Sequence, residues 1–215
     1  MAQQDATVQP PRAGYRHGDL RQALIDAGLE MAREGGPDAV VLREATRRAG
    51  VSPNAAYRHF ADRTALVIAV SDAASGEVAA TIEQEWDAVP AGLPPVESAQ
   101  EHLRAVGMGY LRFARDEPGL FRAAFTVPTD LNEAFGRAKA GPAGRTPFEL
   151  LSTALDELVA AGALPEERRP GAEFACWSAV HGLVMLVLEG PLRDLPQELK
   201  RIAAQRAVEM VVRGI

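Results

Sequence analysis

The chain has 215 residues, 47% of them hydrophobic and 24% charged, with a formal net charge of −6. These values are ordinary for a globular protein of one large domain or two modest ones. The longest apolar run, 182–188, is far shorter than the roughly 18 residues of a membrane span, and residues 1–11 lack the apolar segment of a secretory signal. The single cysteine, Cys176, excludes an intrachain disulfide framework and a cysteine-rich zinc site. We therefore expect a cytoplasmic protein without cofactor, metal or membrane partner.

The charges are unevenly distributed along the chain. Residues 12–63 hold nine arginines and seven acids, a local charge of 9 − 7 = +2, whereas residues 64–215 hold 14 basic and 21 acidic residues, or 14 − 21 = −7. A nucleic acid responds to the local face rather than to the total charge. The charge of the N-terminal part is therefore compatible with DNA binding, although the whole chain is acidic.

The elements taken in chain order are all helical, because alternating β-branched runs are missing and Gly and Pro punctuate helical apolar patterns. We expect a disordered tail over residues 1–13 and a first helix from 18 or 19 to about 33. Further helices are expected at 42–49, 53–59, 62–86, 96–115, 118–125, 148–161, 172–189 and 197–212, with weak helical character over 129–140. This all-α pattern predicts a three-helix head within residues 14–74, a connecting helix, and a helical body over residues 75–215.

The head contains a helix-turn-helix pattern at 42–60. Gly50 stands where the first helix must stop, and glycine takes the positive φ of that position without a Cβ clash. Ser52 is a suitable N-cap for the second helix, and Pro53 follows at the first helical position, where its missing N–H costs nothing. Such a unit places its second helix in the DNA major groove.

These residues resemble the TetR-type transcriptional regulators. The matching text comprises Arg16-His-Gly-Asp-Leu-Arg21, Glu34-Gly-Gly-Pro37, Leu42-Arg-Glu, Arg48-Ala-Gly-Val-Ser52, Tyr57-Arg-His-Phe60 and Leu66, about fifty residues in correct spacing. The body resembles the subgroup with a Trp-x-x-x-His-Gly signature, here Trp177 and His181-Gly182. The resemblance implies a homodimer that binds a pseudo-palindromic double-stranded operator.

The resemblance and the pattern together give a set of expected DNA-binding residues. Tyr57 and His59 match positions that usually engage the phosphate backbone, and Arg63 stands where the family commonly has a phosphate-contacting lysine. Asn54 has the geometry to pair with adenine, although plain helix-start polarity is its alternative. The full set is Arg43, Arg47, Arg48, Ser52, Pro53, Asn54, Ala55, Tyr57, Arg58, His59 and Arg63. Arg47 and Arg48 are as readily solvated surface charges as phosphate contacts.

Two residues depart from the family pattern. Val41 replaces a common Ser or Thr cap, so the second helix is expected to start without one. Thr46 replaces a small residue between two helices, so its extra atoms are expected to alter their packing slightly.

The body offers candidates for an effector pocket and a dimer interface. Aromatic and apolar residues of such a core hollow into a pocket for a small apolar or aromatic molecule in this family; the expected lining is Met108, Tyr110, Phe113, Phe121, Phe125, Phe148, Trp177 and His181. For His181 a buried, satisfied histidine is the commoner alternative to a ligand contact. The last two helices are the expected dimer interface, through Val184, Leu188, Ala207, Met210 and Val211.

The sequence therefore predicts a DNA-binding transcriptional regulator, a repressor released by a small effector. His17 and Asp19 lack a nucleophile, and no catalytic triad order, phosphate loop or metal spacing accompanies them, so we expect no enzyme activity. The alternatives are an activator with the same head, or an all-α ligand-binding or enzymatic protein whose head binds protein.

Overall fold

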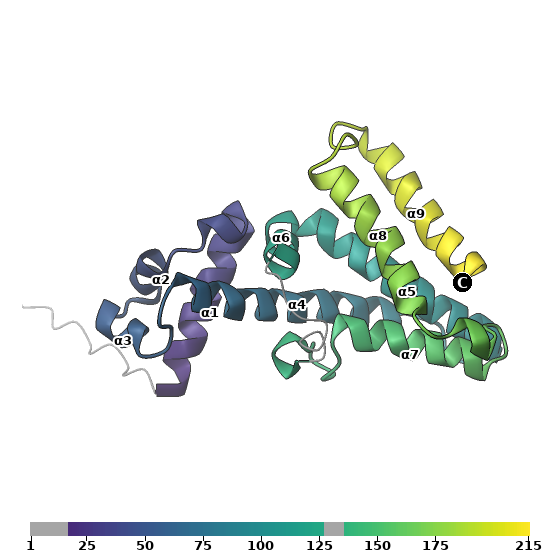
Figure 1. Cartoon of the computed structure of the whole chain (residues 1–215), viewed down its shortest axis with the longest axis horizontal. Coiled ribbons are helices and arrows are strands. Elements are labelled where there is room, and N and C mark those ends of the chain that lie inside the picture. Colours follow the sequence, from purple (N-terminus) through teal and green to yellow (C-terminus); the bar gives the residue numbers. More distant parts are fainter. Residues whose placement is uncertain (1–16, 127–135) are drawn as a thin grey trace, which may run out of the picture.

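A computed structural model describes residues 17–126 and 136–215, and within these ranges it contains helices and no strand (Figure 1). The head consists of α1 (His17–Gly35), the 3-10 turn η1 (Pro37–Ala39), α2 (Leu42–Ala49) and α3 (Pro53–Tyr57). The long α4 (Arg63–Asp87) leads to the body, formed by α5 (Pro95–Asp116), α6 (Pro118–Thr126), α7 (Pro147–Ala160), α8 (Ala172–Leu188) and α9 (Gln197–Gly214). The short 3-10 turns η3 (Arg137–Lys139) and η4 (Glu166–Arg168) lie between body helices.

The all-α prediction is confirmed, and most helix bounds agree within two residues. Helix α3 ends at Tyr57, two residues before the expected end at His59, because the chain turns there and Phe60 folds back into the head core. The expected tail over 1–13 and most of the weak helix expected over 129–140 lie outside the described residues. The described end of that segment is the turn η3.

The helix ends of the head follow from single residues. Gly50 has φ 68° and ends α2, while the Ser52 hydroxyl accepts the Ala55 N–H at the start of α3. The Asp62 carboxylate accepts the Ala65 N–H at the start of α4, whereas Val41 gives α2 no side-chain cap. These caps satisfy backbone donors that a helix start otherwise leaves unpaired. The head is therefore defined by local chemistry that the sequence displays.

The head closes around a small apolar core. Leu24 and Met31 of α1 pack with Ala45 of α2 and with Ala56 and Phe60 at the end of the unit, and all five are buried. Thr46 is also buried, and its hydroxyl donates to the Arg43 carbonyl at 2.6 Å. The extra oxygen of Thr46 is thus satisfied within its own helix.

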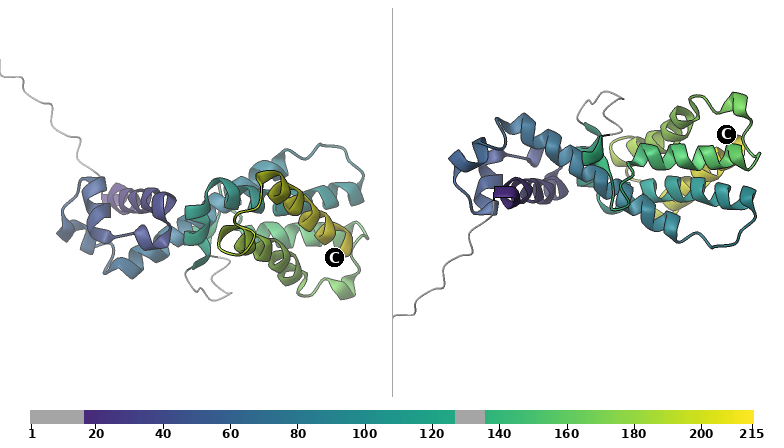
Figure 2. Two further views of the ribbon diagram at one scale, coloured as in Figure 1. Left: turned by 90° about the horizontal axis from the view of Figure 1, so that it is seen from above. Right: turned by 90° about the horizontal axis from the view of Figure 1, so that it is seen from below.

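Helix α4 joins the head to the body and belongs to both (Figures 1 and 2). Its 25 residues extend roughly 37 Å at about 1.5 Å per residue, and they run unbroken across the expected domain boundary at residue 74. The helix is long and apolar enough to meet the composition of a membrane span. Its apolar residues, however, pack against α1, α5, α6 and α7, so α4 is the central core helix of this fold.

Helix α6 forms a second link between head and body. A Cβ at Gly119 would lie 2.3 Å from the Ala32 carbonyl oxygen, so only glycine allows α6 to approach the end of α1 this closely. Beside this contact, Arg33 of α1 pairs with Glu117 at 2.9 Å and with Glu77 of α4 at 3.0 Å. The end of α1 is thereby held against both α4 and α6.

The body packs α4, α5, α7, α8 and α9 around one core. Glycines again permit close approach, because a Cβ at Gly109 of α5 would meet the Ile82 backbone of α4 at 2.7 Å. Helix α7 begins with a capping box, in which the Thr146 hydroxyl accepts the Glu149 N–H and the Glu149 carboxylate accepts the Thr146 N–H. Helices α8 and α9 lie side by side as a pair at one edge of the body (Figure 1).

Candidate DNA-binding surface and effector cavity

The turn and helix at Ser52–His59 present the expected DNA-binding side chains to solvent. Ser52, Pro53, Asn54, Tyr57 and Arg58 are exposed, and Tyr57 keeps 58% of its surface accessible. Ala55 and His59 are half-buried at the edges of this face, while Ala56 is fully buried beneath it. An exposed tyrosine over a buried alanine is the arrangement expected of a surface that binds a partner. We define this exposed set on α3 as the α3 face.

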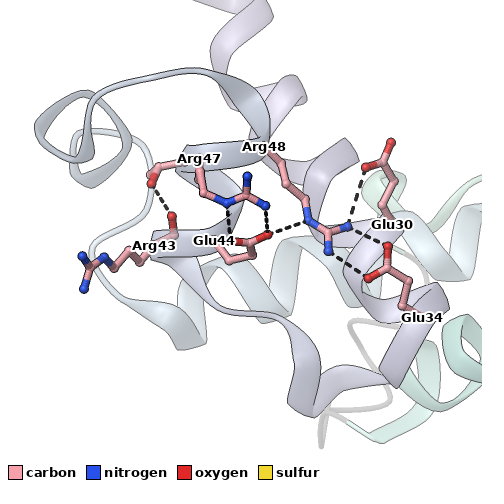
Figure 3. Close-up of polar contacts among 7 residues, drawn as sticks. Glu30, Glu34, Arg43, Glu44, Arg47 and Arg48 are labelled. Atoms are coloured by element: carbon pink, nitrogen blue, oxygen red, sulfur yellow. Dashed lines mark hydrogen bonds and ion pairs between the residues drawn. The ribbon is translucent and has the colours of Figure 1, made fainter.

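The arginines of α2 differ from one another in their partners (Figure 3). Arg47 donates two hydrogen bonds to Glu44, at 2.8 and 2.6 Å. Arg48 donates to Glu34 of α1 at 2.9 and 2.8 Å and to Glu44 at 3.0 Å. The hydrogen bonds from both arginines lower the pKa of Glu44 to about 2, so this carboxylate stays charged at neutral pH. Much of the positive charge on α2 is thus countered within the head.

The side chains of Arg43 and Arg63 differ in whether they are bound to the rest of the head. The Arg43 side chain is exposed, and Figure 3 shows it pointing away from the ion-pair cluster. Arg63 instead donates to the Val40 carbonyl at 2.7 Å and to the carbonyls of Pro37 and Asp38 at 2.9 and 3.3 Å. The expected phosphate contact of Arg63 therefore competes with its hold on the loop between α1 and α2.

The body contains a cavity of about 120 Å³ between α4, α5, α6, α7, α8 and α9. Four of the eight residues expected to line the pocket do so, namely Tyr110, Phe125, Phe148 and Trp177. The rest of the lining is mostly aliphatic, with Ile82, Leu103, Val106, Leu151, Val180, Val208 and Val211 among its members. Because a dry apolar cavity of about 150 Å³ accepts benzene, a site of this size suits a molecule with one ring.

The other four expected pocket residues lie outside the lining of this cavity. Phe113 and Phe121 are 3% and 1% exposed, and they fill the core beside the cavity instead of lining it. Met108 lies on the outer side of α5, in a shallow groove against α9. His181 is also absent from the lining. Helical spacing identified these residues as buried or apolar without showing which side of each helix faces the cavity.

The polar groups at one wall of the cavity satisfy one another. Trp177 Nε1 donates to the Tyr110 hydroxyl at 3.2 Å, and that hydroxyl lies 2.7 Å from His181 Nδ1. Burial raises the pKa of Tyr110 and lowers the pKa of His181, so the tyrosine keeps its proton and the imidazole is neutral. Because the hydroxyl already accepts from Trp177, we assign its own proton to a hydrogen bond onto Nδ1, which places the imidazole proton on Nε2. His181 is thus a half-buried histidine whose Nδ1 is engaged by Tyr110, an arrangement that favours the structural alternative.

Three polar residues that the sequence did not predict for the pocket also line it. They are Ser75 of α4, Lys139 of η3 and Cys176 of α8. Burial raises the pKa of the Cys176 thiol to about 11, so the thiol stays protonated and serves as a small core group. No local pattern in the sequence marks these three as lining residues, although Lys139 and Lys200 are the only lysines of the chain.

The expected dimer residues also fall into two groups. Val184 is buried in the core of its own chain, and Val211 is half-buried and lines the cavity. Leu188 and Ala207 are half-buried, and Met210 is 64% exposed. The exposed large apolar residues of this helix pair are instead Phe174, Met185, Leu186, Leu199 and Met210. We call these five residues the α8–α9 face.

Comparisons of the whole chain decide its family. A sequence profile described as "Tetracyclin repressor-like, C-terminal domain" matches residues 103–211, and one described as "Bacterial regulatory proteins, tetR family" matches residues 24–70. The chain belongs to the TetR family. The N-terminal match covers the head and the start of α4, and the C-terminal match covers α5 to α9.

Solved structures share the fold of this TetR-family chain. A protein of unknown function from Rhodococcus sp. RHA1 is 23% identical with a TM-score of 0.70, over 97% of this chain and 99% of its own. RolR, solved with resorcinol, is 17% identical with a TM-score of 0.60, over 90% and 88%. The TetR-family regulator PfmR from Thermus thermophilus is 19% identical with a TM-score of 0.50, over 89% and 98%. No curated protein matches the chain.

Family membership establishes the general function. The chain is a DNA-binding transcriptional regulator of the TetR family and not an enzyme, in agreement with the sequence prediction. The resemblance of its body to the Trp-His-Gly subgroup stays a prediction. The residues of the DNA, effector and dimer surfaces are proposals that the next subsection develops.

Proposed function

We propose that this regulator is a homodimeric repressor that a small apolar or aromatic molecule releases from its operator. The observation that carries the proposal is the course of α4. This helix starts at the Asp62 cap, directly after the α3 unit, and lines the effector cavity through Ser75 and Ile82. A molecule in the cavity therefore contacts the same rigid element that positions the DNA-binding head.

The α3 face supports the DNA part of the proposal. Its exposed Asn54 can read a base edge, and Tyr57, Arg58 and His59 can hold phosphates on either side. In a dimer, two such faces would enter successive major grooves about 34–36 Å apart on a pseudo-palindrome. Because few of these side chains can make bidentate base contacts, we expect DNA shape to contribute to specificity.

The α8–α9 face supports the dimer part of the proposal. Phe174 and Met185 of α8 are 48% and 38% exposed, and Leu199 and Met210 of α9 are 48% and 64% exposed. Gly182 lies between Phe174 and Met185 in the sequence of α8, and a Cβ there would meet nothing within 4 Å of its own chain. A second helix pair packed on this face would complete a four-helix bundle and cover these side chains.

Release requires the effector to prefer one arrangement of the heads. To convert a 99:1 population of the binding-competent state into 1:99, the effector must favour the other state about 10⁴-fold. Arg33 links α1 to Glu77 of α4 and to Glu117, directly before α6, and this offers a structural route, because a shift of α4 or of the α5–α6 junction moves the end of α1. An effector that instead favoured the DNA-binding arrangement of the same heads would give an activator.

Transcription in vitro from the promoter beside the gene tests the proposal. A repressor lowers the transcript in proportion to operator occupancy, and a Tyr57→Ala variant, which lacks the exposed ring of the α3 face, restores it. Val96→Ala is the matched control, because Val96 is exposed far from the head and its loss should leave repression intact. A transcript that rises when the protein is added identifies an activator and refutes repression.

A further inference from the structure

The cavity combines an apolar body with one cation. Apart from Lys139, its lining contains no charged residue within the described ranges. The Lys139 side chain is only 10% exposed, and its closest charged partner there is Asp72, with Nζ and Oδ1 3.8 Å apart. A buried ammonium is stable only when its charge is compensated, and a pair at this distance is a weak compensation. Lys139 therefore has capacity for a further anionic partner.

A second polar group lies near this cation. Ser75 is 5% exposed and lines the cavity, and in the part of the chain that the structure describes its hydroxyl has no hydrogen-bond partner. Ser75 lies one turn of α4 after Asp72. The next residue, Gly76, packs against the residue after Lys139, because a Cβ added at Gly76 would lie 3.0 Å from the Ala140 carbonyl oxygen. Residues 139 and 140 and this turn of α4 thus form one polar end of the cavity.

The remaining polar groups of the lining are already engaged or inert. The hydroxyl of Tyr110 accepts from Trp177 and donates to His181, and the Cys176 thiol is protonated. Neither group offers a charge to a ligand. The cavity therefore presents apolar walls of ring size together with an ammonium and a hydroxyl, which are both hydrogen-bond donors.

We propose that the effector is a small apolar acid, a monocarboxylate with a single ring or a short chain, whose carboxylate binds Lys139 and Ser75. This inference rests on the proposed function, since it names the class of molecule that the effector cavity accepts. An ammonium–carboxylate contact is a charge-assisted hydrogen bond, stronger than a neutral one. The apolar walls then contact the ring through Phe125 and Trp177.

Calorimetric titration of the full-length protein tests this proposal without DNA. Benzoate and its neutral isostere benzamide are the probes, because they differ in charge and hardly in shape. We expect benzoate to bind at least about tenfold more tightly, as one charged hydrogen bond predicts. Benzamide that binds as well as benzoate, or benzoate and hexanoate that both fail to bind at millimolar concentration, would overturn the proposal.

Three variants identify the residues responsible. Lys139→Met should remove the preference for benzoate and leave benzamide affinity unchanged, whereas Lys139→Arg should keep the preference. Lys200→Met is the matched control, because Lys200 lies on α9 and donates to the exposed Arg193 carbonyl, outside the cavity lining. Unligated melting temperatures verify that each variant folds. A benzoate preference that survives in folded Lys139→Met refutes the role of this lysine.

Failure of the acid-binding proposal can be distinguished from failure of the proposed repression. Benzoate that binds through Lys139 without weakening operator binding refutes release by this class of ligand and leaves the acid-binding site intact. Repression that is relieved by a neutral compound in both the wild type and Lys139→Met supports release and refutes the acid as effector.

Discussion

The hydroxyl of Tyr110 donates a hydrogen bond to Nδ1 of His181 at 2.7 Å, and this contact joins α5 to α8 at the wall of the cavity. The bond requires a neutral imidazole with a free lone pair on Nδ1. Burial lowers the pKa of His181 below its ordinary value near 6.5, in keeping with that requirement. The pair therefore makes the body sensitive to mild acid.

Acid is expected to destabilise the protein through His181. In the unfolded chain the imidazole takes up a proton as the pH falls through about 6.5, whereas in the folded chain it resists until a lower pH. The unfolded state therefore binds more protons in this window, and the free energy of unfolding falls with pH. Since the ring is only half-buried, we expect a loss below about 1 kcal/mol.

Urea unfolding at about pH 7.5 and about pH 5.5 measures this effect. In His181→Asn the titratable ring is absent and an amide oxygen can accept from Tyr110, so the difference between the two pH values should shrink. An equal or larger difference in the variant would assign the acid sensitivity to other groups.

Removing the charge of Glu44 is expected to raise the affinity of the protein for DNA. Glu44 holds Arg47 and also accepts from Arg48, so Glu44→Gln frees a guanidinium beside the α3 face. If Arg47 then contacts a phosphate, the slope of log affinity against log salt steepens by about 1. Fluorescence anisotropy over a salt series measures this slope.

The chain supplies a matched control for this change. Glu198 pairs with Arg201 on α9 through the same three-residue spacing and two hydrogen bonds, remote from the head. Glu198→Gln should leave the salt slope unchanged. A steeper slope in both variants would indicate a response to net charge alone.

Substitutions of Arg63 and Arg43 are expected to affect different properties, the stability of the head and the salt dependence of DNA binding. Arg63→Met leaves three loop carbonyls without their donor, among them the carbonyl of the fully buried Val40, so the head should lose about 1–3 kcal/mol of stability. Arg43→Met removes an exposed charge and should lower the salt slope by about 1 at unchanged stability. Urea unfolding and salt-dependent anisotropy of both variants distinguish the two roles.

Disrupting the α8–α9 face is expected to give monomers. Met185→Glu places a charge among side chains that the proposed bundle would bury, and an unpaired buried charge is strongly unfavourable. Size-exclusion chromatography with light scattering reports the mass of the variant. Val96→Glu, a matched change at an exposed residue of α5, should stay dimeric. A dimeric Met185→Glu would place the interface elsewhere.

The sequence predicted the helices of this fold well because their limits depend on local chemistry. Gly50 adopts the positive φ expected of it, and Ser52 and Asp62 cap the helices that they precede. Val41 lacks a cap as expected. The outward direction of Tyr57 could also be predicted, since Ala56 and Phe60 already supply the buried side.

The cavity could be predicted only in part because it depends on how the helices rotate against one another. Phe113 and Phe125 are both apolar residues at helical spacing, yet Phe125 lines the cavity and Phe113 does not. Val184 was assigned to the dimer surface and instead fills the core. Lys139 reaches the cavity from a turn far from α4 in the chain, and no local pattern reveals such a contact.

The most direct test of the account is the binding of the protein to the DNA beside its own gene. Footprinting should show two protected half-sites about 34–36 Å apart, centred on successive turns of one face of the duplex. Tyr57→Ala should lose this protection at a salt concentration where Val96→Ala keeps it. Protection that is unchanged in Tyr57→Ala, or a single unpaired half-site, would contradict the proposed dimer that reads DNA through its α3 faces.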